Sequence, residues 1–178
     1  LILLVIIMGI AMYNGMIGLK QRAEGAWSDV DVILKKRYNL IPNLVNTIKG
    51  ATKYEGDTLE KVIKARQQAI NVNADDIEKQ IEAENMLQST LRSMFSLTES
   101  YPDLKANAEF TRLMGQLEQI ETEIERARRY YNAVVRDFNV KILKFPGSII
   151  AGMGNFQKLP YYEVEESVMR ENVEVNFE

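Results

Sequence analysis

The polar side chains that could do chemistry lie on or next to the inner faces of expected helices. Gathered in one place, they could form a buried site for an anion or a small ligand. The alternative is a network of ion pairs and hydrogen bonds that fixes how the helices align. We favour the network, because no other feature of the sequence converges on a pocket. The residues are Arg37, Arg66, Glu84, Asn85 and Arg128.

A second candidate is a set of three glutamates at helical spacing, Glu118, Glu121 and Glu125. Carboxylates on one helix face could hold a hard cation. The same spacing is typical of a solvated face, and Arg129 lies four residues after Glu125, where the two can pair. We favour the solvated face and therefore expect neither a metal nor another cofactor.

The composition removes most of the side chains that enzymes use. The 178-residue chain contains no histidine and no cysteine. It therefore lacks the usual general base at neutral pH, the commonest metal ligand and any thiol nucleophile. The sequence also has no nucleotide-binding loop or nucleophile elbow, so we expect a protein that is not an enzyme. The net charge of −3 is spread along the chain, which argues against nucleic acid as a partner.

The elements that must position these residues start with an apolar N-terminus. Residues 1–19 carry no charge, and a helix of this length crosses roughly the ~30 Å hydrocarbon core of a bilayer. We predict one transmembrane helix here, in contact with lipid, although a secretory signal peptide is the alternative. Because the sequence starts at Leu1, we expect the span to begin earlier. Lys20 and Arg22 follow it, which predicts that the remaining chain lies on the cytoplasmic side.

Residues 20–146 predict an all-α domain. Apolar residues recur at spacings of three and four near 23–48, 57–70, 75–97 and 110–138. Short connections join these segments, so we expect an elongated, antiparallel, up-and-down four-helix bundle, its first helix continuous with the span. Pro42 predicts a bend without an end, because the apolar register continues through it. Asn107 is placed to cap the last helix.

Residues 147–178 form a C-terminal extension of different character. Its start is apolar and glycine-rich, and residues 173–177 alternate in a strand-like manner that a helical bundle cannot pair. Such a tail could dock on its own domain, dock on a neighbouring subunit or remain loosely ordered. Surface aromatic and polar residues suit a protein interface. The candidate interface residues are Tyr130, Asn132, Tyr161, Tyr162 and Phe177.

Several runs of residues resemble the LemA family of bacterial membrane-anchored proteins. They include 26–32 (AWSDVDV), 35–45 (KKRYNLIPNLV), 101–107 (YPDLKAN) and 128–132 (RRYYN). The resemblance extends to about Phe156 and leaves the second half of the tail as a feature particular to this chain. It implies a helical bundle behind one span in the bacterial cytoplasmic membrane, and no established enzymatic activity. Relatives in this family include proteins of magnetosome membranes and proteins encoded beside membrane-bound stress proteases.

Together these features favour a non-enzymatic, single-span membrane protein whose bundle self-associates. We expect a homo-oligomer that scaffolds or recruits other membrane proteins, such as a stress protease. The alternative is a sensor that binds a ligand or a lipid through the polar residues inside the bundle. Full mutual pairing of Arg37, Arg66 and Glu84 would argue against that sensor. An enzyme ranks third, because it would need a cleft that gathers tyrosines, lysines or carboxylates.

Overall fold

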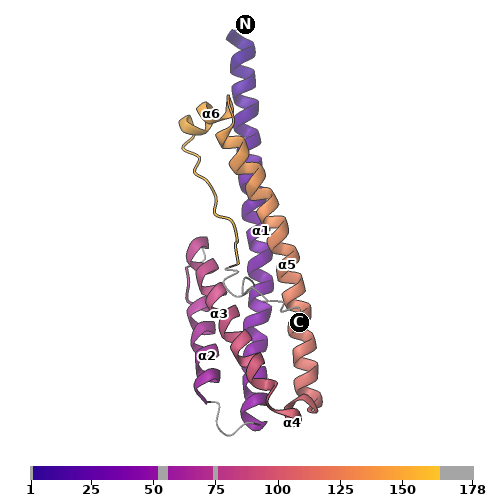
Figure 1. The fold of residues 1–178 in the computed structure, drawn as a ribbon. Coiled ribbons are helices and arrows are strands. Elements are labelled where there is room, and N and C mark those ends of the chain that lie inside the picture. The colour runs from indigo at the N-terminus through magenta and orange to yellow at the C-terminus, as the bar shows by residue number, and fades with distance from the viewer. Residues whose placement is uncertain (1, 52–55, 74–75, 165–178) are drawn as a thin grey trace, which may run out of the picture.

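The computed structural model describes residues 2–51, 56–73 and 76–164. Within these ranges the chain forms helices and no strands, as expected for an all-α protein. The helices are α1 (Ile2–Ala51), α2 (Gly56–Ile70), α3 (Ile77–Thr98), α4 (Pro102–Lys105), α5 (Ala108–Leu143) and α6 (Gly147–Met153). Figure 1 shows them as an elongated molecule with the N-terminus at one tip.

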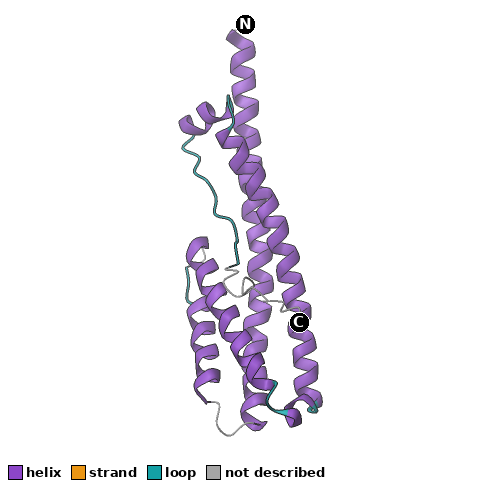
Figure 2. Ribbon diagram, viewed as in Figure 1, coloured by secondary structure: helices purple, strands orange, loops and turns teal. Residues whose placement is uncertain are grey.

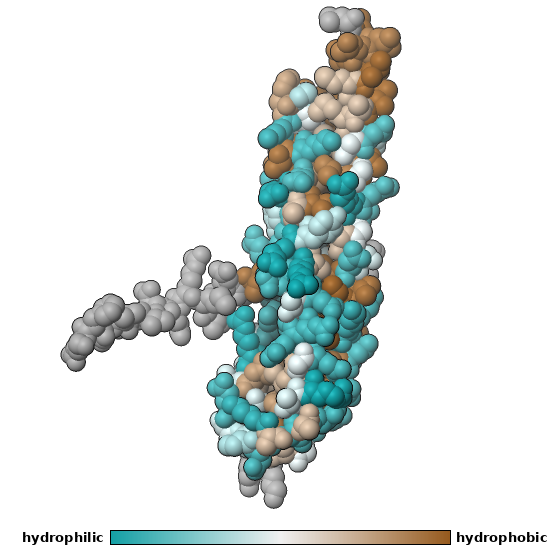
Figure 3. Space-filling view, turned by 90° about the vertical axis from the view of Figure 1, so that its right-hand side faces the viewer, coloured by the Kyte–Doolittle hydropathy of each residue, from teal (hydrophilic) through white to brown (hydrophobic). Residues whose placement is uncertain are grey.

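α1 is one uninterrupted helix of 50 residues. It confirms the expected rod that joins the apolar N-terminus to the body, and Pro42 lies inside it without ending it. By length and composition, α1 could cross a membrane, and residues 2–8 at its start are exposed. Apolar residues gather at this tip of the molecule, whereas most of the body is hydrophilic (Figure 3). The placement of the apolar surface therefore fits a membrane anchor at one end.

α1 and α5 pack side by side in opposite directions and form the long axis of the structure (Figure 1). The Asn107 side chain caps α5 as expected, since its Oδ1 accepts hydrogen bonds from the backbone N–H groups of Glu109 and Phe110. The seam of α5 follows the three-and-four spacing in the sequence. Its buried apolar residues include Leu113, Leu117, Ile124, Tyr131, Val134 and Phe138.

α2 and α3 form a shorter hairpin beside the half of α1 that lies away from the N-terminus (Figure 1). They contain 15 and 22 residues, against 36 in α5. At ~1.5 Å per residue they can cover only part of the long pair. The all-α class is confirmed. The arrangement is a long antiparallel helix pair with a hairpin beside one part of it, which does not confirm the expected four-helix bundle in detail.

The remaining part of the long pair is covered by α6 and by a segment that the sequence did not place. α5 ends at Leu143, close to the expected end of the domain at residue 146, and the seven-residue α6 follows. From α6 an extended loop returns along the body to the α2–α3 hairpin (Figure 2). We call residues 154–164 of this loop the C-terminal strap. A second, smaller core of Met16, Phe138, Ile142 and Ala151 lies under α6.

The cap of α5 gives a first prediction. Asn107→Ala removes the acceptor for two backbone N–H groups and should lower the free energy of unfolding by about 1 kcal/mol. Asn107→Asp keeps an acceptor oxygen at the same place and should retain most of the stability. Denaturant titration in detergent, followed by circular dichroism, measures both variants. Equal losses in the two variants would show that the cap is not the cause.

Candidate functional site

The centre of the body is a buried cation, Arg37 on α1, whose side chain has no exposed surface. The apolar spacing of α1 carries Arg37 into the seam between Leu34 and Ile41. Its guanidinium donates to the carboxylate of Glu84 on α3 through Nη2, and to that of Glu121 on α5 through Nη1 at 2.9 Å. One side chain thus links three helices through charge-assisted hydrogen bonds.

Tyr38, the next residue, extends this network. Its hydroxyl donates to Glu84, and Gln80 on α3 donates from Nε2 to the Tyr38 hydroxyl at 2.9 Å. Arg66 on α2 donates from Nε to the backbone carbonyl of Tyr38 at 2.7 Å. We call Arg37, Tyr38, Arg66, Gln80, Glu84 and Glu121 the buried polar network. It joins all four of the longer helices.

The surroundings of Arg37 and Tyr38 keep the first charged and the second neutral near neutral pH. Burial on its own would lower the pKa of Arg37, but the carboxylates of Glu84 and Glu121 outweigh it and raise that pKa. Burial, reinforced by the Glu84 carboxylate, raises the pKa of Tyr38. Neither group is poised to exchange a proton at pH 7. Most of its polar groups pair with one another, and in the described chain the buried Nε of Arg37 has no partner. This arrangement favours a network that aligns the helices.

The C-terminal strap is held by two asparagines of α5. The Asn139 amide donates to the carbonyl of Leu159 and accepts from its backbone N–H, each at 2.9 Å. Asn132 does the same for Tyr162, at 3.0 and 2.8 Å. The asparagines are seven residues apart, ~10.5 Å on a helix, and their partners are three residues apart, ~10 Å in an extended chain. The two spacings are nearly equal, so both asparagines of α5 can bond to the backbone of the extended strap at once.

Aromatic packing fixes the strap between these bonds. The Tyr131 hydroxyl donates to the carbonyl of Pro160 at 2.9 Å. Tyr162 is only 3% exposed, and its ring lies 6.0 Å from that of Trp27. Asn85 on α3 donates to the carbonyl of Glu163 at 3.2 Å. The described part of the tail therefore docks on its own domain.

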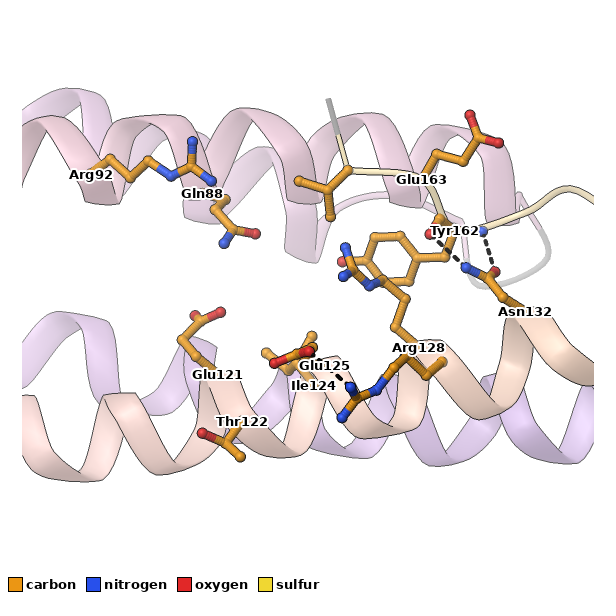
Figure 4. A pocket seen from close by; sticks show the side chains of 12 residues that line it. Gln88, Arg92, Glu121, Thr122, Ile124, Glu125, Arg128, Asn132, Tyr162 and Glu163 are labelled. Atoms are coloured by element: carbon orange, nitrogen blue, oxygen red, sulfur yellow. Dashed lines mark hydrogen bonds and ion pairs between the residues drawn. The ribbon is translucent and has the colours of Figure 1, made fainter. Parts of the chain in front are cut away.

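A groove of about 790 Å³ lies between α3 and α5 where the strap reaches the hairpin (Figure 4). Gln88 and Arg92 of α3 line one wall, and residues 121–132 of α5 line the other, with the strap at one end. Glu125 pairs with Arg129 at 3.3 Å. Arg92 and Arg128 form no ion pair with any described residue. Within the described ranges, the groove thus offers the guanidinium groups of Arg92 and Arg128 without an ion pair, in a lining that mixes polar and apolar side chains.

The structure distributes the residues expected from the sequence over these three places. Arg37, Arg66 and Glu84 lie in the buried polar network, but Asn85 holds the strap and Arg128 lines the groove. The sequence pattern shows which face of a helix a residue occupies, but not which residue of a neighbouring helix lies at the same level. The pattern therefore places Asn85 and Arg128 with Arg37, although they lie elsewhere.

The expected interface residues fall into two groups, one exposed and one occupied by contacts of the strap. Tyr130 is 54% exposed and Tyr161 39%, as a contact surface would require. Asn132 and Tyr162 are instead occupied by the strap contact, because Tyr162 fills the core beside Trp27. Phe177 lies outside the described residues.

Sequence reasoning missed Tyr38, Gln80, Asn139 and the role of Glu121. The spacing of the glutamates predicts a solvated face for Glu121, whereas its carboxylate accepts a hydrogen bond from Arg37. A signal for the strap contact was present, because Asn132 and Asn139 stand one heptad apart along a seam of apolar residues. Among the described residues no cluster of three or more acidic side chains could hold a metal ion.

Comparison with known proteins finds one family. The model described as "LemA family" matches residues 26–177. The match reaches well past Phe156, so the expectation that the second half of the tail is particular to this chain is wrong.

The individual relatives are only distantly similar to this chain in sequence. Protein LemA of Metamycoplasma hominis is 27% identical over 141 residues, which cover 79% of this chain and 62% of that protein. Magnetosome protein MamQ 2 of Paramagnetospirillum magneticum is 22% identical over 177 residues, covering 85% and 64%. Magnetosome protein MamQ of Magnetospirillum gryphiswaldense is 21% identical, covering 84% and 64%. The chain spans less than two thirds of the length of these relatives. None of the three names states an enzymatic activity.

The buried polar network gives a prediction about stability. Glu84→Leu leaves Arg37 buried with one carboxylate fewer and should lower the free energy of unfolding by about 3–5 kcal/mol. The double variant Arg37→Met with Glu84→Leu removes both charges and should recover much of that loss. Chemical denaturation of both proteins measures the difference. If the double variant is no more stable than the single one, the buried charge is not what destabilises it.

The buried tyrosines predict a loss of stability at high pH. Burial raises the pKa of Tyr131 from 10.0 to about 12 and also raises the pKa of Tyr162. Between these pH values the folded state keeps the proton that the unfolded state loses, so the free energy of unfolding should fall as the pH rises from 10.0 to about 12.

Denaturation at a series of pH values, with tyrosinate absorbance, tests this expectation. In Tyr131→Phe the decline should be shallower, because one group no longer titrates. A profile that stays flat above pH 10.0 would contradict the assignment.

Proposed function

The chain belongs to the LemA family, a membership carried by the match over residues 26–177, and from that premise we propose that it is a non-enzymatic, membrane-anchored scaffold. In this proposal α1 spans the bacterial cytoplasmic membrane once, and the body lies on the cytoplasmic side. The body self-associates and recruits other membrane proteins, with a membrane-bound stress protease as one candidate partner.

The shape of α1 supports the scaffold. Because α1 continues without a break from the apolar tip into the body, no joint separates a span from the domain. Copies anchored in one bilayer would hold their bodies parallel and at the same height. Lys20 and Arg22, which follow the apolar stretch, support the cytoplasmic side.

The α3–α5 groove is the observation that carries the binding function. Arg92 and Arg128 lie in it without an ion pair to any described residue, and Gln88 and Thr122 add groups that can bond to a peptide backbone. Guanidinium groups favour carboxylates. An extended, acidic peptide segment is therefore the ligand that fits this groove best.

For self-association, the segment that we propose is residues 165–178 of a neighbouring copy. This stretch contains five glutamates and one arginine, and it follows directly on Val164, which lines the groove. Its net charge is opposite to that of Arg92 and Arg128, for which no described residue supplies an ion pair. Since anchored copies stand at one height, the tail of each copy begins at the level of its neighbour's groove.

A sensor that uses the buried polar network is less well supported. Arg37 and Glu84 bond to each other, and Arg66 bonds to the backbone of α1, so each residue that such a sensor would use already has a partner inside the bundle.

The test is the mass of the full-length protein in mild detergent, measured by light scattering. We expect a discrete oligomer that becomes a monomer in the variant Arg92→Glu with Arg128→Glu, and also in a chain that ends at Val164. Arg126→Glu is the matched control, because it reverses one exposed charge of α5 outside the groove.

Two outcomes would count against the proposal. A full-length protein that is already monomeric would exclude self-association in detergent. If a peptide of residues 165–178 then binds the shortened chain, the tail occupies the groove of its own copy. An oligomer that survives both changes would place the interface outside the groove.

A further inference from the structure

The segment from Phe145 to Phe156 has an apolar outer side that no described residue covers. It contains no charged residue, and Lys144 and Lys158 bracket it. Its large apolar side chains are exposed to an unusual degree, with Phe145 at 81%, Ile149 at 55% and Met153 at 82%. Apolar side chains that gather on a surface in this way indicate contact with another apolar phase.

The inner side of the same segment packs on the apolar part of α1. A Cβ added to Gly147 would lie 3.1 Å from Cε of Met16. A Cβ added to Gly9 would lie 3.7 Å from Cδ1 of Ile150. The segment therefore lies beside residues 9–16, inside the uncharged stretch of the helix that is long and apolar enough to cross a membrane. Figure 1 shows α6 near the tip that carries the N-terminus.

At both ends of α6, backbone N–H groups of the segment bond to nearby backbone carbonyls. The N–H of Ser148 donates to the carbonyl of Lys144 at 2.9 Å, and the N–H of Phe156 donates to that of Ala151 at 3.0 Å. Internal bonding of this kind is what contact with lipid requires. The ring of Phe156 also lies 5.5 Å from that of Tyr13, and aromatic side chains are favoured at the membrane interface.

From these contacts we propose that residues 145–156 form an interfacial element that inserts its outer face into the boundary between headgroups and acyl chains, next to the span. The ligand is the lipid surface, because the α1 contact holds the segment at the level of the apolar stretch. Lys144 and Lys158 lie at the edges of the element, where they can meet anionic headgroups. The protein is then held in the bilayer by two apolar elements instead of one.

The experiment uses the full chain in vesicles of phosphatidylcholine and phosphatidylglycerol. Because the chain has no native cysteine, Met153→Cys and Ile149→Cys each accept a single environment-sensitive fluorophore. Ser89→Cys, on the exposed surface of α3, is the matched control. Nitroxide groups near the top of the acyl chains quench a label in lipid, and iodide quenches a label in water.

We expect the labels at positions 149 and 153 to emit further to the blue than the label at position 89. Lipid nitroxides should quench them severalfold more than they quench position 89, and iodide should quench them less. If iodide quenches all three labels alike, the segment lies in water and the proposal fails. If neither quencher reaches positions 149 and 153, the face is covered by protein, such as a second copy, and the proposal also fails.

Discussion

The body of the protein depends on how a fully buried cation is compensated. Arg37 has no exposed surface, and moving an unpaired charge out of water costs far more free energy than one side chain's packing can return. Only an arrangement that brings Glu84 and Glu121 to its two terminal guanidinium nitrogens, Nη2 and Nη1, offsets most of that cost. The helices could slide past one another on apolar contacts alone, but not without separating these charges. The ion pairs therefore set the alignment of α1, α3 and α5, and the apolar seams supply most of the stabilisation around it.

The strap covers apolar residues in the half of the molecule that the α2–α3 hairpin does not reach. There the short α6 covers only a part of the seam of the long helix pair. An extended chain can cover the rest only if its backbone polar groups find partners. Asn132 and Asn139 provide those partners at the spacing of the strap, while Tyr162 contributes its ring to the core. A few residues therefore supply both the apolar contacts that cover the seam and the hydrogen bonds that hold the strap.

The sequence predicts the long elements well because their signals are local. The seam of α5, the cap at Asn107 and the continuity of α1 through Pro42 all follow from spacing within one helix. The strap could not be predicted in the same way, because Asn139 and Leu159 are brought together only by a reversal of the chain at α6. That helix has seven residues, too few for a helical period to show. The sequence predicts only a part of the candidate site. Arg37 and Glu84 do meet in one network, but Arg128 lies in the groove, since a helix face does not determine position along the axis.

The continuity of α1 also changes the thermodynamics of any association between copies. Two freely tumbling proteins lose translational and rotational entropy when they bind, and this loss opposes association. If α1 spans the membrane as proposed, the body has already lost most of its orientational freedom relative to the bilayer, and its centre moves in two dimensions only. The effective concentration of one copy around another is correspondingly high. Contacts too weak to be detected between dissolved fragments can therefore be sufficient to hold neighbouring copies together in the membrane.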